Sequence, residues 1–188
     1  KVELPDKKKV VGVGVSANYS NSRYLFAVNG HNREFEKYPA SYDMNVNAHF
    51  KYSPRGFVKL FLLREGDRIG VSIDDPSQLL FYNSNNLMDF GWLYWQHRIS
   101  SRFTMNANLA ATGYAQDQDF GTGYMFTKNN YYQGRIYLDS KLSNVLQATV
   151  GVDLFNFSKS YLGEYTEESS GVDSLRTFDY LYKSKLFA

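Results

Sequence analysis

The stretch YYQGRIYLDSKLSNVLQATVGVDL, residues 131–154, repeats one pattern of side chains on both sides of a short turn. In each half, apolar and polar residues alternate, and only a β-strand places alternate side chains on opposite faces. Ser143 and Asn144 between the halves favour a turn too short for a crossover, so we predict an antiparallel hairpin with one apolar and one polar face. Each arm is long enough to cross a bilayer, which takes about 9–11 tilted residues.

The same alternation recurs along the 188-residue chain and predicts about nine strands. They cover residues 11–19, 23–30, 44–52, 57–63 with an extension towards 73, 87–99, 103–112, 131–142, 146–157 and 178 to the end. Apolar residues with helical spacing are not sustained anywhere. The sequence therefore predicts a single all-β domain over residues 1–188.

The predicted connections alternate between short turns and long polar loops. The turns lie at Ser20, Ser53, Ser100 and Ser143, and the loops begin at Asn32, Asp74, Gln116 and Gly163. Outer-membrane barrels have short periplasmic turns and longer external loops, and their lumen accepts polar side chains along the strands. We therefore expect an antiparallel transmembrane β-barrel of long amphipathic strands. A soluble β-sandwich has the same alternation and is the alternative fold.

Composition excludes several classes of protein. The formal net charge of +2 is too small to indicate a nucleic-acid partner, and the absence of Cys excludes disulfides and thiolate metal sites. No apolar run approaches the roughly 18 residues of a membrane helix, but a barrel hides its lipid-facing side chains in alternation. The high aromatic content, 17%, indicates a folded chain.

Two segments resemble a known family. The hairpin at residues 131–154 and the turn-and-strand unit SPRGFVKLF, residues 53–61, are similar to the barrel of TonB-dependent outer-membrane receptors of the kind abundant in Bacteroidetes. The resemblance lies in long amphipathic strands and in connections rich in Tyr and Asn, and it covers most of the chain. It implies a barrel of about twenty-two strands around a plug, in the outer membrane of a Gram-negative bacterium. Such receptors import siderophores, vitamins, glycans or peptides.

The resemblance also implies a set of partners. These are outer-membrane lipid, the remaining barrel strands and plug, an inner-membrane complex that supplies energy through a short box, and a small-molecule or oligomeric nutrient. No plug or box is recognisable in the sequence, and nine is an odd number where bacterial single-chain barrels have even ones. We therefore expect a segment of a larger barrel, or one chain of a split barrel.

Motifs for catalysis or cofactors are weak, so we expect no enzyme and no cofactor. Residues 12–17, GVGVSA, match a dinucleotide fingerprint, but that motif requires a following helix, and here the strand pattern continues. Asp117 and Asp119 beside Gly121 are a weak calcium candidate, because the remaining ligands of the loop motif are missing. The three histidines have no metal-ligand spacing.

Aromatic residues are the strongest functional candidates. Phe90, Trp92, Tyr94 and Trp95 within one predicted strand are expected to contribute to a girdle at the lipid headgroups. Because external loops carry recognition, the loop candidates for ligand binding are Tyr38, Tyr42, Phe81, Tyr82, Tyr124 and Phe126.

Three functions remain open from the sequence. The first is a transport receptor whose external loops capture a nutrient and whose lumen conducts it. The second is a barrel component of an outer-membrane assembly or secretion system. The third is a soluble sandwich that binds carbohydrate through Trp92, Trp95 and tyrosines of the loops.

Overall fold

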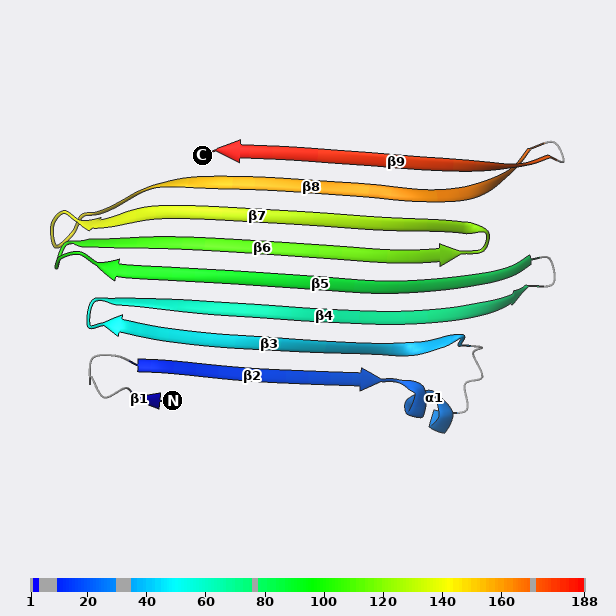
Figure 1. Ribbon diagram of the computed structural model, residues 1–188, viewed down its shortest axis with the longest axis horizontal. Helices are drawn as coiled ribbons and strands as arrows, with labels where there is room; N and C mark the ends of the chain where they lie inside the picture. Colours follow the sequence, from blue (N-terminus) through cyan, green and yellow to red (C-terminus); the bar gives the residue numbers. More distant parts are fainter. Residues whose placement is uncertain (1, 4–9, 30–34, 76–77, 170–171, 188) are drawn as a thin grey trace.

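The computed structural model describes residues 2–3, 10–29, 35–75, 78–169 and 172–187. They form one antiparallel sheet in which each strand pairs with its neighbours in sequence, and one short helix (Figure 1). The prediction of an all-β chain is therefore confirmed, apart from that helix. The strands are β1 (Val2–Glu3), β2 (Val10–Asn21), β3 (Lys37–Ser53), β4 (Gly56–Asp75), β5 (Gln78–Arg98), β6 (Phe103–Phe120), β7 (Gly123–Lys141), β8 (Gln147–Ser169) and β9 (Val172–Phe187).

The sheet is open. β1 has two residues and pairs only with Val10 and Val11 of β2, so most of β2 is one edge. β9 is the other edge, and among the described residues it pairs with β8 alone. The sheet therefore has eight long strands, β2 to β9, which is an even number, and within the described residues both of its edges lack a further partner strand. An open sheet of this kind is consistent with part of a barrel.

The strand predicted at residues 23–30 is wrong, because residues Arg23–Asn29 form the helix α1. The backbone N–H of Phe26 donates to the carbonyl oxygen of Ser22 at 3.1 Å, which closes the first helical turn. The Asn21 side-chain oxygen accepts a hydrogen bond from the N–H of Arg23 at 2.9 Å. These interactions satisfy backbone groups at the helix start, and local capping here prevails over the alternation of Tyr24, Phe26 and Val28.

The long polar loops predicted from Asp74, Gln116 and Gly163 are also wrong. β4 and β5 pair along almost their whole length. The pairing begins with Gly56 opposite His97 and ends with Asp75 opposite Gln78. The other two pairs likewise continue through the polar segments, β6 with β7 as far as Phe120 and Gly123 and β8 with β9 as far as Ser169 and Val172. Backbone pairing forms a ladder whatever the polarity of the side chains, so polar residues on both faces do not end a strand. The loop predicted from Asn32 to Asp43 is wrong for residues 37–43, which belong to β3, and its part before residue 35 lies outside the described residues.

The turns predicted at Ser53, Ser100 and Ser143 are confirmed, and all three lie at the same end of the sheet, at the left of Figure 1. In each turn the serine hydroxyl oxygen accepts a hydrogen bond from the backbone N–H two residues later, at 3.1–3.2 Å. This local bond stabilises the reversal of the chain. Ser20, the fourth predicted turn, instead lies in β2.

Candidate functional site

The strand register divides the side chains into two faces of different chemistry. One row of paired residues crosses the sheet from β2 to β9 and is almost wholly apolar, and we call the face that carries it the apolar face. The row comprises Val13, Ala48, Leu60, Leu93, Leu109, Gly134, Leu154 and Phe187. The adjacent row on the other side, the polar–aromatic face, comprises Gly14, Asn47, Phe61, Trp92, Ala110, Gln133, Phe155 and Leu186.

The apolar face has no protein layer against it. Among the residues whose side chains the structure describes, no hydrophobic residue is buried. Val15, Leu109 and Val150 on this face are 69%, 54% and 73% exposed. A contiguous exposed apolar surface marks a site of contact with another protein or with a membrane.

On the polar–aromatic face, most side chains of the central strands are half-buried, whereas about half of those on the apolar face are exposed. Phe155, for example, is half-buried, and Leu154 beside it is exposed. This difference is expected when a sheet curves towards one face, because side chains converge on the concave side. The burial pattern therefore favours the polar–aromatic face as the inner face of a curved sheet.

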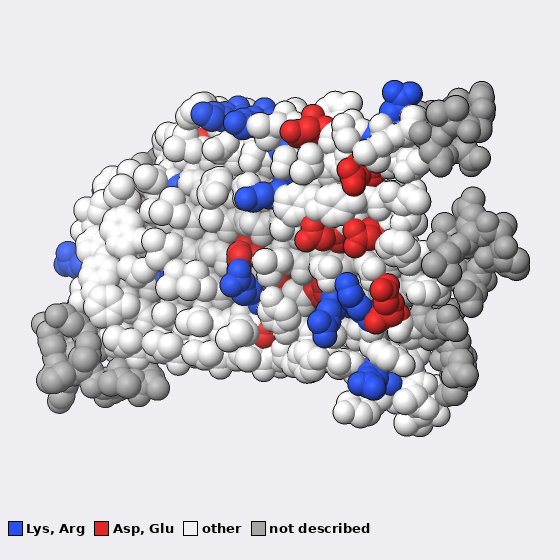
Figure 2. Space-filling view, turned by 45° about the vertical axis from the view of Figure 1, so that its right-hand side comes forward, with Lys and Arg blue, Asp and Glu red and all other residues white. Residues whose placement is uncertain are grey.

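The apolar surface is a band that covers only part of the strand length. On β4 and β5 it ends at the ion pair between Arg64 and Asp89, with Nε–Oδ1 at 3.0 Å. On β9 the band includes Phe187 only, because the side chains that precede it on the same face are the charged residues Lys185 and Lys183. Figure 2 shows charged side chains gathered over one half of the visible surface and few on the other half. The border of the band thus crosses the strands obliquely.

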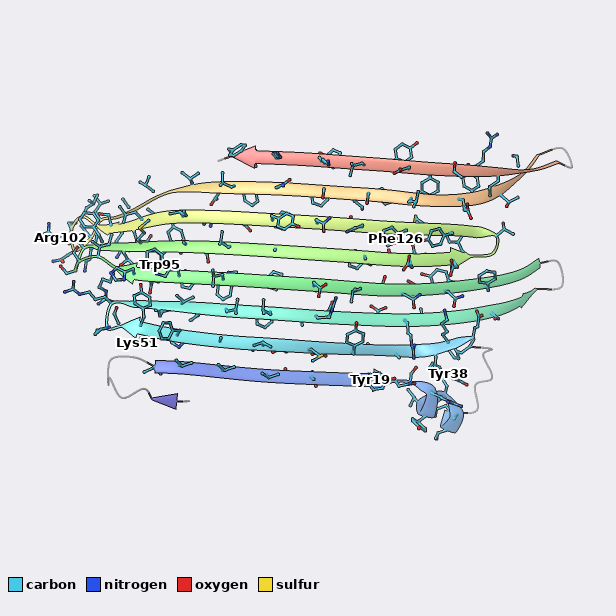
Figure 3. All side chains as sticks on the ribbon, in the orientation of Figure 1. Tyr19, Tyr38, Lys51, Trp95, Arg102 and Phe126 are labelled. Carbon is cyan, nitrogen blue, oxygen red and sulfur yellow. The ribbon has the colours of Figure 1, made fainter. Side chains whose placement is uncertain are left out.

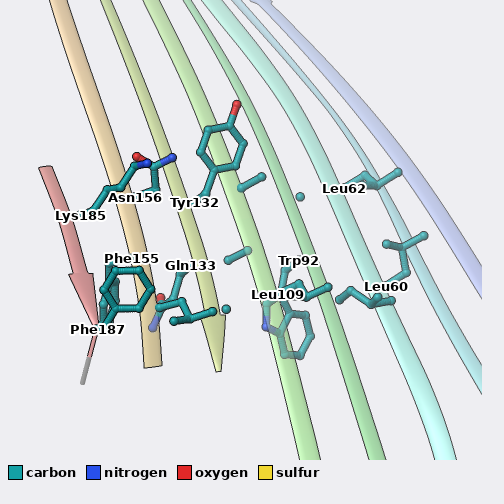
Figure 4. Close-up of a pocket in the computed structure, with 16 residues that line it drawn as sticks. Leu60, Leu62, Trp92, Leu109, Tyr132, Gln133, Phe155, Asn156, Lys185 and Phe187 are labelled. Carbon is teal, nitrogen blue, oxygen red and sulfur yellow. The ribbon is translucent and has the colours of Figure 1, made fainter. Parts of the chain in front are cut away.

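Within the band, small residues leave a shallow hollow of about 590 Å³ (Figure 4). Its lining includes the small residues Gly91, Ala111 and Gly134, together with Leu62 and Leu109. A Cβ added at either glycine would meet a leucine methyl group at 3.5 Å, an ordinary contact. The hollow therefore has room for an acyl chain or another apolar group.

The three short turns are staggered in a regular way. The distance of each turn can be counted along the strands from the apolar row of paired residues defined above. From one turn to the next, the residue pair that closes the turn lies two residues further from this row. The closing pairs are Ser53 with Gly56, Ile99 with Phe103, and Leu142 with Leu146. Two residues rise about 6.6 Å, and two strand spacings are about 9.6 Å. If the turns lie in one plane, the strands are tilted by about 35°, which is the tilt typical of transmembrane barrels.

A hydrogen-bond network crosses the polar–aromatic face near these turns. The Tyr94 hydroxyl donates to Asn106 Oδ1 at 2.8 Å, and Asn106 Nδ2 donates to Asp139 at 2.8 Å. The Thr149 hydroxyl donates to the same carboxylate at 2.7 Å. The network joins β5, β6, β7 and β8, and Asn106 at its centre is only 1% exposed. Because its polar groups satisfy one another, it holds the strands in register.

The structure divides the four residues predicted to form a girdle between the two faces. Phe90, Trp92 and Tyr94 lie on the polar–aromatic face, where the rings of Trp92 and Tyr94 are parallel at 5.8 Å. Trp95 lies on the apolar face. The four residues therefore do not share one face, and their contribution to a girdle stays a prediction. The sequence could have predicted this division, because residues 94 and 95 are adjacent in a strand and must point to opposite faces.

An aromatic cluster that the sequence did not indicate surrounds Trp95 on the apolar face. Trp95 Nε1 donates to the Tyr52 hydroxyl at 2.9 Å, and that hydroxyl is 2.8 Å from Nδ1 of His97. The rings of Tyr52 and His97 are parallel at 5.8 Å. Only the pairing of β4 with its two neighbours brings these residues of β3 and β5 together, because Gly56 between them has no side chain.

The six aromatic residues assigned to loops all lie in strands. Tyr38 and Tyr42 belong to β3, Phe81 and Tyr82 to β5, and Tyr124 and Phe126 to β7. The register does not gather them at one place, and no cavity described in the structure is lined by more than one of them. Figure 3 shows Tyr38 beside α1 and Phe126 near the connection of β6 with β7. Their role in ligand binding stays a prediction.

The weak calcium candidate lies in β6 and not in a loop. Asp117 and Asp119 share the apolar face, beyond the band. Asp117 Oδ1 accepts a hydrogen bond from the Tyr124 hydroxyl at 3.0 Å. Desolvation and this carboxylate raise the pKa of Tyr124 above its ordinary value. Within the described part of the chain, no three His, Cys, Asp or Glu residues gather as a metal site would require.

Comparison with known proteins gives no match to a family model, a curated protein or a solved structure. In the described ranges, no helix has the length and apolar character that a membrane span requires.

Proposed function

We propose that the chain is a wall segment of an outer-membrane β-barrel that belongs to a TonB-dependent receptor, with its apolar face towards lipid and its polar–aromatic face towards the lumen. The observation that supports this most strongly is the oblique apolar band on one face of a sheet without a core. In a barrel wall, lipid takes the place of the missing layer. The inner face then needs no apolar partner, because it borders water or a plug.

The dimensions of the band agree with this proposal. On β6 the band extends from Phe103 to Ala111, eight residues apart, which is about 26 Å along the strand. At a tilt of about 35° this spans about 22 Å of membrane, close to the roughly 25 Å of an outer-membrane barrel. At the end of the sheet opposite the short turns, the pairs β4–β5 and β8–β9 continue beyond the band as polar hairpins that would project from the membrane.

The edges of the sheet require further strands. Lipid offers no hydrogen bonds, so an unpaired strand edge in the hydrocarbon region costs several kcal/mol for each unsatisfied group. The edges of β2 and β9 would therefore pair with the remaining strands of the barrel, in the same chain or in another. The plug would lie against the polar–aromatic face.

As a receptor, the barrel would import a scarce nutrient and would not perform covalent chemistry. The projecting hairpins would capture the ligand, and the rings and amides of the polar–aromatic face would line its path. An inner-membrane complex would supply the energy through a segment outside this chain. The nutrient would be a siderophore, vitamin, glycan or peptide.

Adjacent residues on opposite faces test the orientation of the wall. In a membrane-embedded barrel, Leu109→Arg places a charge in lipid and should destabilise the fold by about 2–4 kcal/mol. Asn108→Arg is the matched control, because Asn108 lies on the polar–aromatic face, where lumen substitutions are tolerated. Urea unfolding in lipid vesicles measures both. Equal effects of the two variants would contradict the assignment of the faces.

The receptor assignment is tested by the native polypeptide extracted from outer membranes in detergent. A receptor predicts a mass several times 21.7 kDa, the mass of this chain, and a plug with an upstream box in the same polypeptide. A native barrel without plug or box would instead support an assembly or secretion component. A 21.7 kDa chain that is monodisperse without detergent would favour the carbohydrate-binding sandwich.

No feature of the described residues favours the sandwich. A sandwich buries the inner faces of two sheets against each other. The described strands form a single sheet, and none of the hydrophobic side chains described in them is buried.

A further inference from the structure

A basic pocket of about 390 Å³ lies on the polar–aromatic face at the end of the sheet that carries the short turns. Residues from four successive strands and one turn line it. Its basic residues are His49 and Lys51 of β3, Arg55 of the first short turn, Lys59 of β4 and Arg98 of β5. Thr104 of β6 closes one side. Figure 3 labels Lys51 at this end of the sheet.

The basic charge of the pocket has no internal compensation. Five of its ten lining residues are basic and none is acidic. The ion pairs found among the described residues are those of Arg64 with Asp89 and Arg135 with Asp153, so neither involves a residue of the pocket. Asp139 pairs in register with Thr104, but its oxygens accept hydrogen bonds from Asn106 and Thr149. The cations of the pocket are therefore available to an external anion.

The backbone fixes these cations near one another. Lys51 and Lys59 are diagonal neighbours in the β3–β4 register, because Lys51 lies two residues from His49, which is directly opposite Lys59. The N–H of Arg98 donates to the carbonyl oxygen of Arg55 at 2.7 Å, which ties the first turn to β5. Like charges placed across neighbouring strands repel and destabilise a sheet. A bound anion would remove this cost, and it would gain from several cations at once.

The floor of the pocket is aromatic. Phe57 is half-buried, the Lys59 ammonium group lies 5.4 Å from its ring centre, and the His49 ring meets it edge-on at 5.4 Å. These contacts restrict two of the basic side chains at the pocket wall. Arginine adds paired N–H donors that match the two oxygens of a phosphate or carboxylate group.

We propose that this pocket binds a small oxyanion with at least two negative charges, carried on phosphate or carboxylate groups. The proposal does not rest on the receptor assignment, because it requires only that this face is open to water. The four residues of fixed positive charge supply the attraction, and Thr104 supplies a neutral hydroxyl donor. A monoanion would engage too few of these groups to bind at physiological salt.

Calorimetric titration of the full chain in a nonionic detergent tests the proposal, with pyrophosphate and citrate as separate probes at about 150 mM salt. Binding of either probe with a Kd below about 1 mM is expected, and the better probe identifies the group that is recognised. The double variant Lys59→Gln/Arg98→Gln should weaken binding at least tenfold. Arg55→Gln alone should weaken it by a smaller factor.

Lys128→Gln/Lys183→Gln is the matched control, because it removes the same charge from the opposite face. It should leave the Kd within about twofold, since distant charges are screened at this salt concentration. Far-UV circular dichroism checks that each variant keeps the fold. Equal weakening by both double variants would show general attraction to a basic protein and would overturn the proposal. Failure of the parent chain to bind either probe would do the same.

Discussion

Gly151 faces Tyr137 across the β7–β8 pair, and the space between them is smaller than any side chain needs. A Cβ at Gly151 would lie 2.7 Å from the carbonyl oxygen of Ile136 and 2.6 Å from the Tyr137 Cβ. Neither atom can move without moving the backbone of β7. Gly134 differs, because its nearest contact is a flexible leucine methyl group at 3.5 Å. Nothing in the sequence separates these two glycines, since both sit in alternating strands.

Gly151→Ala should therefore destabilise the fold by about 1–3 kcal/mol, as overpacking does. Gly134→Ala should have little effect or stabilise slightly, because alanine restricts the unfolded chain more than glycine does. Urea unfolding followed by tryptophan fluorescence compares the two. The close approach of the strands at Gly151 would be disproved by equal midpoints.

Tyr52 illustrates a contact that only the fold creates, since its partners are 43 and 45 residues away in the sequence. Tyr52→Phe removes the acceptor of Trp95 and the partner of His97, and should cost about 1–2 kcal/mol for two hydrogen bonds. Tyr132→Phe is the control, because Tyr132 lies on the same face and its hydroxyl has no hydrogen bond to the described residues. Thermal or urea unfolding measures both, and an equal loss would contradict the predicted role of the hydrogen bonds.

At the scale of elements, alternation predicted the strands with an apolar face and failed elsewhere for two physical reasons. Residues 116–120 and 123–130 are too polar to be recognised as strands, yet the ladder of β6 and β7 includes them. Conversely, the alternation of Tyr24, Phe26 and Val28 predicted a strand where backbone N–H groups donate to the oxygens of Asn21 and Ser22 and start α1. The short serine turns were predictable because their stabilising bonds are local.

Amide hydrogen exchange distinguishes the observed ladder from the predicted loop. Amides paired across β6 and β7 in residues 114–130 should exchange as slowly as those of residues 104–112, because the same ladder continues through both. Ser101 in the second short turn provides an internal reference for fast exchange, because its N–H has no hydrogen-bond partner among the described residues. Exchange of residues 116–120 at the rate of that turn would contradict the extended hairpin.

At the scale of the molecule, the sequence predicted the amphipathic, all-β character but not the shape of the band. That shape depends on the register of the strands. At the border opposite the short turns, the band ends at the pair Tyr19–Tyr42 on β2 and β3 and at Phe187 on β9. The two-residue stagger of the turns follows the same slope. The candidate site was predictable only by residue type: aromatic residues were expected, but which face each one occupies follows from strand pairing.

The two tryptophans provide the most direct test that one face contacts lipid and the other the lumen. In Trp92→Phe, the remaining Trp95 lies on the apolar face, and in Trp95→Phe, the remaining Trp92 lies on the polar–aromatic face. In the membrane-embedded protein, brominated lipid should quench the fluorescence of Trp95 and not of Trp92, while aqueous acrylamide should quench Trp92 more strongly. Equal quenching of both by brominated lipid, or quenching of neither, would contradict the barrel wall.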